Sequence, residues 1–145
     1  MNDNFYQVFA KLLADTYTLY LKTQNYHWNV HGPYFKTLHI MFEEQYMQLA
    51  LGVDALAERI VTLGHTAPAS FAEFSALRSI KEGDSKKTAE QMVSELCDDH
   101  QLILKDLYKV LKIAQEHNDE GSTTLLGDRI AEHEKIHWML RASKA

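Results

Sequence analysis

Residues 26–64 read YHWNVHGPYFKTLHIMFEEQYMQLALGVDALAERIVTLG, and this stretch decides the fold. A Gly-Pro pair at 32–33 interrupts it, and apolar residues recur at helical spacing from about Phe35 to Leu63. The pattern predicts one long helix, preceded by a tight turn and by the end of an earlier helix. Its apolar stripe comprises Leu38, Phe42, Leu49, Val53, Leu56, Ile60 and Leu63.

Polar residues with metal-binding side chains flank this stripe. His39, Glu43, Asp54 and Glu58 fall within an arc of about 100° around the predicted helix. The Gly-Pro turn folds the preceding helix back, so His27 can join His39. His39 and Asp54 are separated by about 22 Å along the helix, whereas a metal–ligand bond measures about 2 Å. His27, His39, Asp54 and Glu58, called the four candidate ligands below, therefore cannot meet on one metal ion within one chain.

A two-fold axis removes this difficulty. If the same helix of a second chain packs antiparallel and crosses near Met47, the histidines of one chain lie opposite the carboxylates of the other. Such an isologous contact builds two equal sites. Ala50 and Ala57 on this side of the helix allow the two backbones to approach closely. The sequence therefore predicts a homo-oligomer whose metal sites lie between subunits.

Three further long helices are predicted on either side of this segment. The first runs from about Asn4 to Asn29, with Asn2 or Asp3 as its cap. Another runs from a cap at Asp84 or Ser85 to about Glu116, and the last runs from about Thr123 to Arg141 after a turn at 118–122. The fold class is therefore all-α.

The connection at residues 65–84 is long for a helical protein. Gly64 ends the preceding helix and Pro68 follows it, as is usual beyond a helix carboxyl end. Phe71, Phe74, Leu77 and Ile80 predict a short amphipathic helix inside the connection. Four long helices with one long crossover predict a ferritin-like four-helix bundle, with this short extra helix between the second and third.

Composition narrows the class of protein further. The length of 145 residues fits one domain spanning 1–145. The formal net charge of −5 argues against a dedicated nucleic-acid binder. The single cysteine, Cys97, excludes an internal disulfide framework and is expected in the core. No stretch has the pattern of a signal peptide or a membrane helix, so we expect a cytoplasmic protein without a membrane partner.

Three motifs carry a resemblance to a known family. H-W-N-V-x-G-P-x-F-x-x-L-H begins at His27, F-E-x-x-Y follows at Phe42, and V-D-x-x-A-E-R-I follows at Val53. Together they resemble the Dps family, the small ferritins named as DNA-binding proteins from starved cells. In that family a ferroxidase centre lies at a two-fold subunit interface, with two histidines from one chain and an aspartate and a glutamate from the other. The four candidate ligands occupy those positions.

The resemblance implies a function and an assembly. Nitrogen and oxygen ligands suit Fe(II), and also Mn(II) or Zn(II), so the choice of iron rests on the resemblance. It implies a twelve-subunit shell that binds Fe(II) between subunits, oxidises it with hydrogen peroxide or dioxygen, and stores ferric mineral. Two rival functions are a DNA-compacting protein and a cage whose metal is structural or absent. Family members that bind DNA often use basic tails, and here the first twenty residues offer only Lys11, so we expect weak or no DNA binding.

Further roles are implied for individual residues. Glu43 is expected as an outer iron ligand or an iron-nucleating carboxylate. A tryptophan at the position of Trp28 lies near the metals in the family and is a candidate radical quencher. The acid-lined pores of the family align with Asp119, Thr124 and Asp128, although the middle acid is missing here.

Other clusters of potential ligands are not expected to form the metal site, and the pair of Glu134 and His137 is interpreted as a surface charge pattern. A site inside one bundle needs two Glu-x-x-His pairs, and this chain has one, Glu134 and His137. His133 stands four residues before His137, without a third protein ligand in the pattern. The run Asp98, Asp99 and His100 is expected to be solvated, because adjacent helical residues point in different directions.

Overall fold

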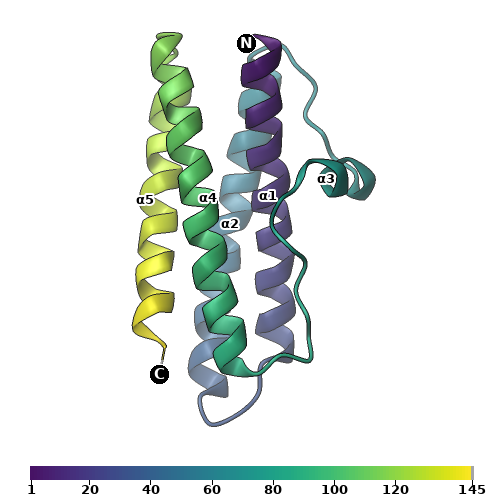
Figure 1. Ribbon diagram of the computed structural model, residues 1–145, viewed down its shortest axis with the longest axis vertical. Coiled ribbons are helices and arrows are strands. Elements are labelled where there is room, and N and C mark those ends of the chain that lie inside the picture. The colour runs from purple at the N-terminus through teal and green to yellow at the C-terminus, as the bar shows by residue number, and fades with distance from the viewer. Residues whose placement is uncertain (145) are drawn as a thin grey trace.

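The computed structural model describes residues 1–144, and Figure 1 shows its five helices. They are α1 (Asp3–Asn29), α2 (Phe35–Thr62), α3 (Phe71–Leu77), α4 (Ala89–Glu116) and α5 (Glu120–Ala142). No strand occurs within the described residues. The predicted all-α architecture is therefore confirmed, including the short extra helix, α3, in the long connection.

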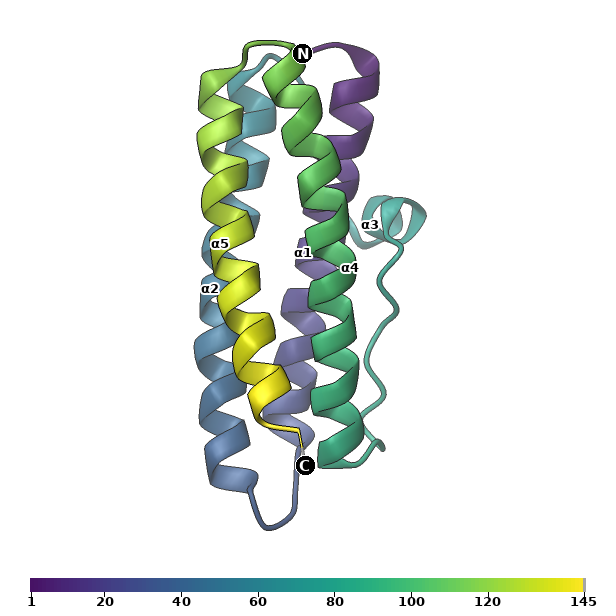
Figure 2. The same cartoon turned by 60° about the vertical axis from the view of Figure 1, so that its left-hand side comes forward.

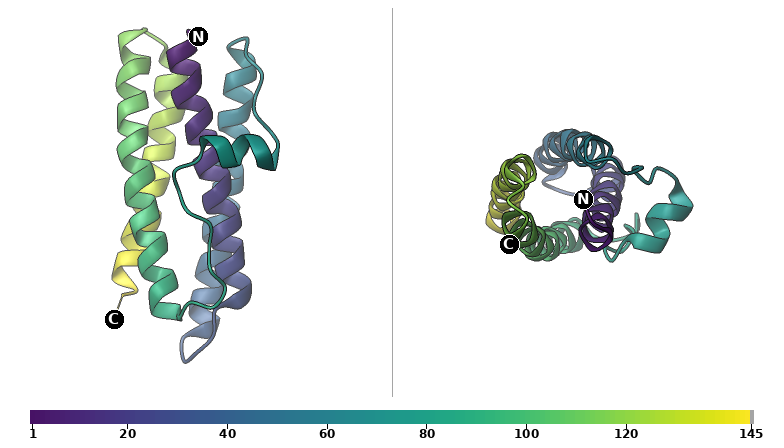
Figure 3. Two further views of the ribbon diagram at one scale, coloured as in Figure 1. Left: turned by 45° about the vertical axis from the view of Figure 1, so that its right-hand side comes forward. Right: turned by 90° about the horizontal axis from the view of Figure 1, so that it is seen from above.

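The four long helices form a bundle in which each contacts two others. α1 lies between α2 and α4, and α5 lies between α4 and α2, as the view along the bundle in Figure 3 shows. Figure 2 shows α4 and α5 as one hairpin, joined by a short turn. α3 lies outside the bundle against α1. The crossover between α2 and α4 thus runs along the outside of α1 and lets α4 start at the opposite end.

Buried polar bonds fix the crossover to α1. The carboxylate of Asp15, which is buried in α1, accepts the backbone N–H groups of Ser79 and Ile80 at 2.7 and 2.9 Å. Charge-assisted bonds of this kind are among the stronger hydrogen bonds in proteins. Ile80 is buried here, although it lies beyond the end of α3 at Leu77. The apolar spacing predicted that Ile80 belongs to the short helix, whereas its side chain anchors the extended segment that follows.

Helix ends differ from the expectation at two places. Thr88, rather than Asp84 or Ser85, caps α4, and it forms a capping box with Gln91. α5 begins at Glu120 instead of about Thr123, because the side chain of Asp119 accepts the N–H of Ser122. The predicted cap of α1 is confirmed, since Asn2 accepts the N–H of Phe5. Several polar residues near a helix end can serve as its cap, so apolar spacing alone does not determine the residue at which the helix begins.

A histidine pair lies in the interior between α4 and α5. His100 and His133 are both buried, and their Nδ1 atoms are 2.8 Å apart. Arg129, also buried, donates to Nε2 of His133 at 3.3 Å. The interpretation of His100 as part of a solvated face was wrong. It stands four residues after Leu96 and three before Ile103, so the helical period places it on the buried stripe.

This buried pair predicts a loss of stability in acid. Burial lowers the pKa of His100 to about 3 and lowers the pKa of His133 well below its ordinary value. In the unfolded chain both imidazoles take up a proton below pH 6.5, whereas in the folded chain they stay neutral. The unfolded state therefore binds more protons, and the free energy of unfolding falls as the pH drops from 6.5 to 5.

Urea denaturation at pH 7 and 5 checks this prediction. The double variant His100→Leu, His133→Leu should show a shallower pH dependence than the unchanged chain, and the exposed-site variant His31→Ala should not. An equal pH dependence in all three proteins would contradict the assignment of acid sensitivity to the buried pair.

Within residues 1–144, no helix has both the length and the apolar character needed to cross a lipid bilayer.

Candidate metal centre

The turn between α1 and α2 positions the first half of the predicted site. α1 ends at Asn29 and α2 begins at Phe35. Gly32 adopts a φ of +117°, which side chains with a Cβ rarely adopt, and its carbonyl accepts the N–H of Phe35 at 3.1 Å. The turn therefore folds α2 back along α1 and brings the last residues of α1 beside the first turns of α2.

His27 and His39 meet across this hairpin. Nδ1 of His27 lies 2.6 Å from the backbone carbonyl of His39, and Nδ1 of His39 lies 2.7 Å from that of His27. The two imidazoles are stacked, with ring centroids 3.9 Å apart and planes 9° from parallel. The two histidines that were predicted to meet across the turn are thus brought together. Their reciprocal bonds to backbone carbonyls were missed, because such acceptors carry no residue-specific pattern in a sequence.

These two bonds fix the tautomer of both rings. A carbonyl oxygen only accepts, so each Nδ1 must carry the proton that it donates. In the neutral ring Nε2 is then unprotonated and offers a lone pair, which is the form that binds metal ions. A hydrogen bond from the remaining ring N–H also orients metal-binding histidines in general. The chemistry of this donor pair therefore fits a divalent metal ion.

Aromatic rings hold the two imidazoles on both sides. The ring of Phe35 stacks on His39 with a centroid distance of 4.9 Å. The ring of Tyr46 packs its edge against His27 at 5.3 Å. His27 is buried and His39 is half-buried, so the rings have little freedom to reorient. The surrounding rings therefore hold both imidazoles in fixed orientations.

The carboxylate half lies further along α2. Asp54 and Glu58 are exposed, and they lie one helical turn apart on α2. α2 is one continuous helix from Phe35 to Thr62, so the distance of about 22 Å between the levels of His39 and Asp54 stands. None of the ion pairs within the described residues involves either carboxylate. In the same part of the chain, no group of three or more His, Cys, Asp or Glu side chains could hold a metal ion.

The surface around these carboxylates is apolar. Four large hydrophobic side chains project from the same side of α2 with exposed fractions of 41–64%, and they are Ile40, Met47, Leu51 and Val61. Together with Asp54 and Glu58 they are called the α2 flank below. At 100° per residue these six positions span an arc of about 80°. An apolar patch with two carboxylates is typical of a surface that another protein covers. The meeting of the four candidate ligands across two chains remains a prediction.

The other residues implied by the family pattern have diverse environments. Glu43 is exposed one turn beyond His39, and Trp28 is 62% exposed beside His27.

The acids aligned with the family's pores lie at α5. Asp119 caps α5, and its carboxylate accepts a hydrogen bond from the guanidinium of Arg59 at 2.7 Å. Burial alone would raise the pKa of Asp119, but the hydrogen bonds from Ser122 and Arg59 outweigh it and lower that pKa. Asp128 is exposed on α5. The role of these acids in a pore remains a prediction.

Comparisons with known proteins agree with the motifs. The model of the ferritin-like domain matches residues 7–143. "DNA protection during starvation protein 2" from Bacillus anthracis is 41% identical over 142 residues, covering 98% of this chain and 97% of that protein. "General stress protein 20U" from Bacillus subtilis is 37% identical over 142 residues, covering 98% of each.

Solved structures give the same answer. The Dps protein of Staphylococcus aureus superposes with a TM-score of 0.95 at 31% identity, covering 99% of this chain and 97% of that one. The Dps protein of Vibrio cholerae O1, described as one of the ferritin-like diiron-carboxylate proteins, superposes with a TM-score of 0.92 at 37% identity, covering 96% and 87%. The chain belongs to the Dps proteins of the ferritin-like superfamily.

Proposed function

We propose that this protein stores iron and detoxifies it as a ferroxidase. Fe(II) is the substrate, and it binds between two copies of the chain at the four candidate ligands. Hydrogen peroxide or dioxygen oxidises it, and the ferric product is stored as mineral inside a hollow shell of twelve subunits. The simultaneous removal of Fe(II) and peroxide would suppress hydroxyl-radical formation and protect against oxidative damage.

One observation carries this proposal. The reciprocal bonds of His27 and His39 to each other's backbone carbonyls leave both Nε2 atoms free to bind a metal ion. A merely structural histidine pair would not need both rings held in this tautomer. Two imidazoles and two carboxylates form a nitrogen and oxygen donor set that suits Fe(II).

The protein residues have separate tasks in this reaction. The imidazoles of His27 and His39 supply neutral donors, whereas Asp54 and Glu58 of the other subunit supply two negative charges. These charges stabilise the ferric product more than the ferrous substrate, and so favour oxidation. The apolar α2 flank would exclude bulk water once a second chain covers it. Glu43, exposed one turn from His39, is suited to receive ferric ions that leave the site.

Fe(II) oxidation with and without hydrogen peroxide tests the proposal. Absorbance of the ferric product should rise faster with protein than without it, and sizing of the particle should give a shell that contains iron. Binding of Fe(II), Mn(II) or Zn(II) without faster oxidation would instead indicate a cage with a structural metal.

DNA compaction is the second candidate function, because three similar proteins carry names that refer to DNA protection. The formal net charge of −5 opposes association with the phosphate backbone. We predict weak or no binding of this 145-residue chain to DNA near neutral pH. A gel-shift assay at moderate salt checks this, and tight, saturable binding would contradict it.

A further inference from the structure

We propose that Trp28 of one subunit fills an apolar pocket of the other subunit at their two-fold interface. This inference rests on the interface of the proposed function, although it does not depend on the oxidation of iron. It gives an exposed indole a task in assembly. It also names the contact that fixes the register in which the two halves of a metal site meet.

The pocket lies between α1, α2 and the crossover, and we call it the crossover pocket. Its volume is about 400 Å³, and its lining includes Tyr17 of α1, Val53 and Ala57 of α2, and residues 67–71 of the crossover. None of its lining residues is charged. Phe71 on its rim is 76% exposed. An open apolar pocket of this kind suits a large hydrophobic side chain of another protein chain.

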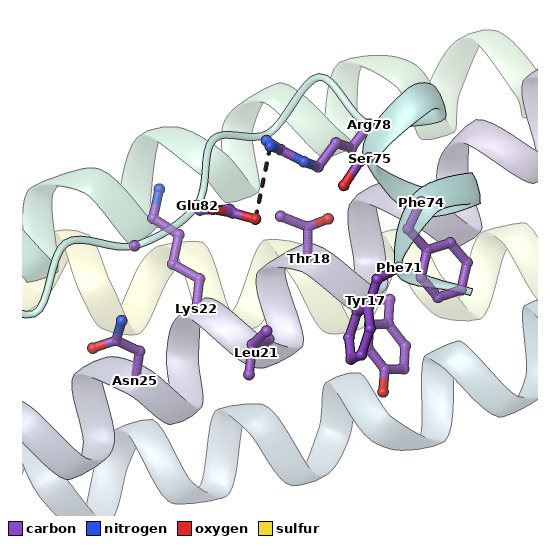
Figure 4. A pocket seen from close by; sticks show the side chains of 11 residues that line it. Tyr17, Thr18, Leu21, Lys22, Asn25, Phe71, Phe74, Ser75, Arg78 and Glu82 are labelled. Atoms are coloured by element: carbon purple, nitrogen blue, oxygen red, sulfur yellow. Dashed lines mark ion pairs between the residues drawn. The ribbon is translucent and has the colours of Figure 1, made fainter. Parts of the chain in front are cut away.

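Aromatic rings form the outer wall of the crossover pocket. Tyr17 stacks on Phe74 at a centroid distance of 4.9 Å. Both rings and Phe71 also line a neighbouring pocket of about 230 Å³, and Figure 4 shows them grouped at one end of it. Lys22 and Asn25 lie at its other end. The neighbouring pocket is thus polar at one end, whereas the crossover pocket offers an apolar lining to a single hydrophobic group.

Trp28 is suited to fill such a pocket. Its side chain is 62% exposed at the end of α1, and none of the ring contacts within residues 1–144 involves it. Phe35, which is also exposed, already stacks on His39. Tryptophan is enriched among the side chains that dominate binding at protein interfaces. Trp28 is therefore a ring that a second chain can pack.

A chain cannot fill this pocket with its own indole. Tyr17 and Trp28 lie on the same continuous helix, and the rise between them is about 16 Å. The occupant of the crossover pocket must therefore come from another chain.

Two-fold symmetry brings the indole of the partner to the level of the pocket. His27 adjoins Trp28 in the sequence, and its ring stacks on His39, so Trp28 lies near the level of His39 along α2. The predicted antiparallel crossing places this level opposite Asp54 of the other chain. Val53 of the crossover pocket directly precedes Asp54, so the pocket lies at the same level.

The same symmetry places the indole on the side of the pocket. A two-fold axis between two antiparallel helices runs perpendicular to both and to the line that joins them, so it leaves α1 of both chains on one side of the α2 pair. Trp28 belongs to α1, and α1 bounds the crossover pocket on this side. Level and side together bring Trp28 of the partner subunit to the mouth of the pocket.

This contact fixes the register of the interface. The apolar side chains of the α2 flank recur along the helix, so by themselves they permit the two α2 helices to slide by one turn. One turn is about 5.4 Å, whereas a metal–ligand bond measures about 2 Å. A slipped interface would therefore lose the metal site, and an indole seated in a pocket prevents the slip.

Fluorescence of Trp28 tests the contact. The chain has two tryptophans, so the variant Trp138→Phe leaves Trp28 as the only indole. In this background Ala67→Leu fills the pocket, whereas Ala76→Leu adds the same bulk to an exposed position of α3 outside it. In the assembled protein we expect Trp28 to emit at short wavelength and to be shielded from acrylamide. Ala67→Leu should shift the emission to longer wavelength and raise the quenching constant severalfold, and Ala76→Leu should not.

Cross-linking tests whether the contact joins two chains. A chain with Trp28→Cys and Ala67→Cys, treated with a short bismaleimide, should give covalent dimers on a denaturing gel, because the two positions lie too far apart within one chain. Trp28→Cys with Ala131→Cys, an exposed position on α5, is the matched control. The unchanged chain controls for Cys97, which is buried. Neither control should give dimers.

The outcomes separate this contact from the proposed function. Solvent-exposed emission of Trp28 in the assembled protein, or equal behaviour of Ala67→Leu and Ala76→Leu, refutes the contact. If Ala67→Leu does not fold, the cross-link between positions 28 and 67 decides, and its absence refutes the contact. Fe(II) oxidation without this cross-link leaves the ferroxidase proposal standing alone. Cross-linked dimers that do not oxidise Fe(II) support the contact and refute the ferroxidase instead.

Discussion

Replacement of His27 and His39 together by alanine should slow Fe(II) oxidation by on the order of 100-fold or more. The physical reason is the loss of both nitrogen donors, which the structure holds in the metal-binding tautomer through their bonds to backbone carbonyls. The carboxylates of the other subunit would remain, but two exposed carboxylates one helical turn apart bind Fe(II) weakly by themselves. Alanine keeps the helical propensity of both positions, so the bundle should still form.

Two single variants control this result. His31→Ala removes an exposed histidine from the same turn, and His137→Ala removes a half-buried one from α5. Stopped-flow absorbance should give near-normal oxidation rates for both, with circular dichroism and sizing confirming that every variant folds and assembles. If His137→Ala slowed oxidation more than the double variant did, the site would lie inside the bundle and the interface assignment would be wrong.

The strongest sequence features predicted the fold well. The apolar stripe of α2 is a 3.6-residue pattern sustained over 28 residues, and the observed helix matches it to within one residue at its end. The Gly-Pro turn and Gly64 mark the helix ends because both glycines adopt positive φ, at +117° and +89°. The pairing of His27 with His39 followed from the same turn, so half of the candidate site could be read from spacing alone.

The features that were missed depend on tertiary contacts. Thr88 caps α4 because the side chain of Gln91, three residues later, completes a capping box. Several polar residues nearby could also have served as the cap, so the sequence alone did not identify it. The burial of His100 depends on a partner, His133, from another helix. Tyr20 on α1 and Tyr46 on α2 meet through a ring contact that no spacing in a single helix reveals. Sequence periodicity gives the face on which a residue lies, but not the polar or aromatic group that it meets.

The requirement for two chains gives the second large effect. A chain with His27→Ala and His39→Ala keeps the carboxylate half of the site, and a chain with Asp54→Asn and Glu58→Gln keeps the histidine half. Each should be inactive when it assembles alone. The continuity of α2 from Phe35 to Thr62 prevents either half from reaching the other within a chain.

Co-assembly of the two inactive chains should therefore restore activity. A mixed dimer has one interface site with all four candidate ligands and one with none. Random pairing of equal amounts makes half of the dimers mixed, so roughly a quarter of the sites, and at most about a quarter of the normal activity, should return. Separate affinity tags and native mass spectrometry would verify the mixed assemblies before the oxidation assay. A site within one chain predicts no recovery, because neither chain carries a complete set of ligands. Verified mixed assemblies that stay inactive would thus overturn the inter-subunit site, whatever the activity of the unchanged protein.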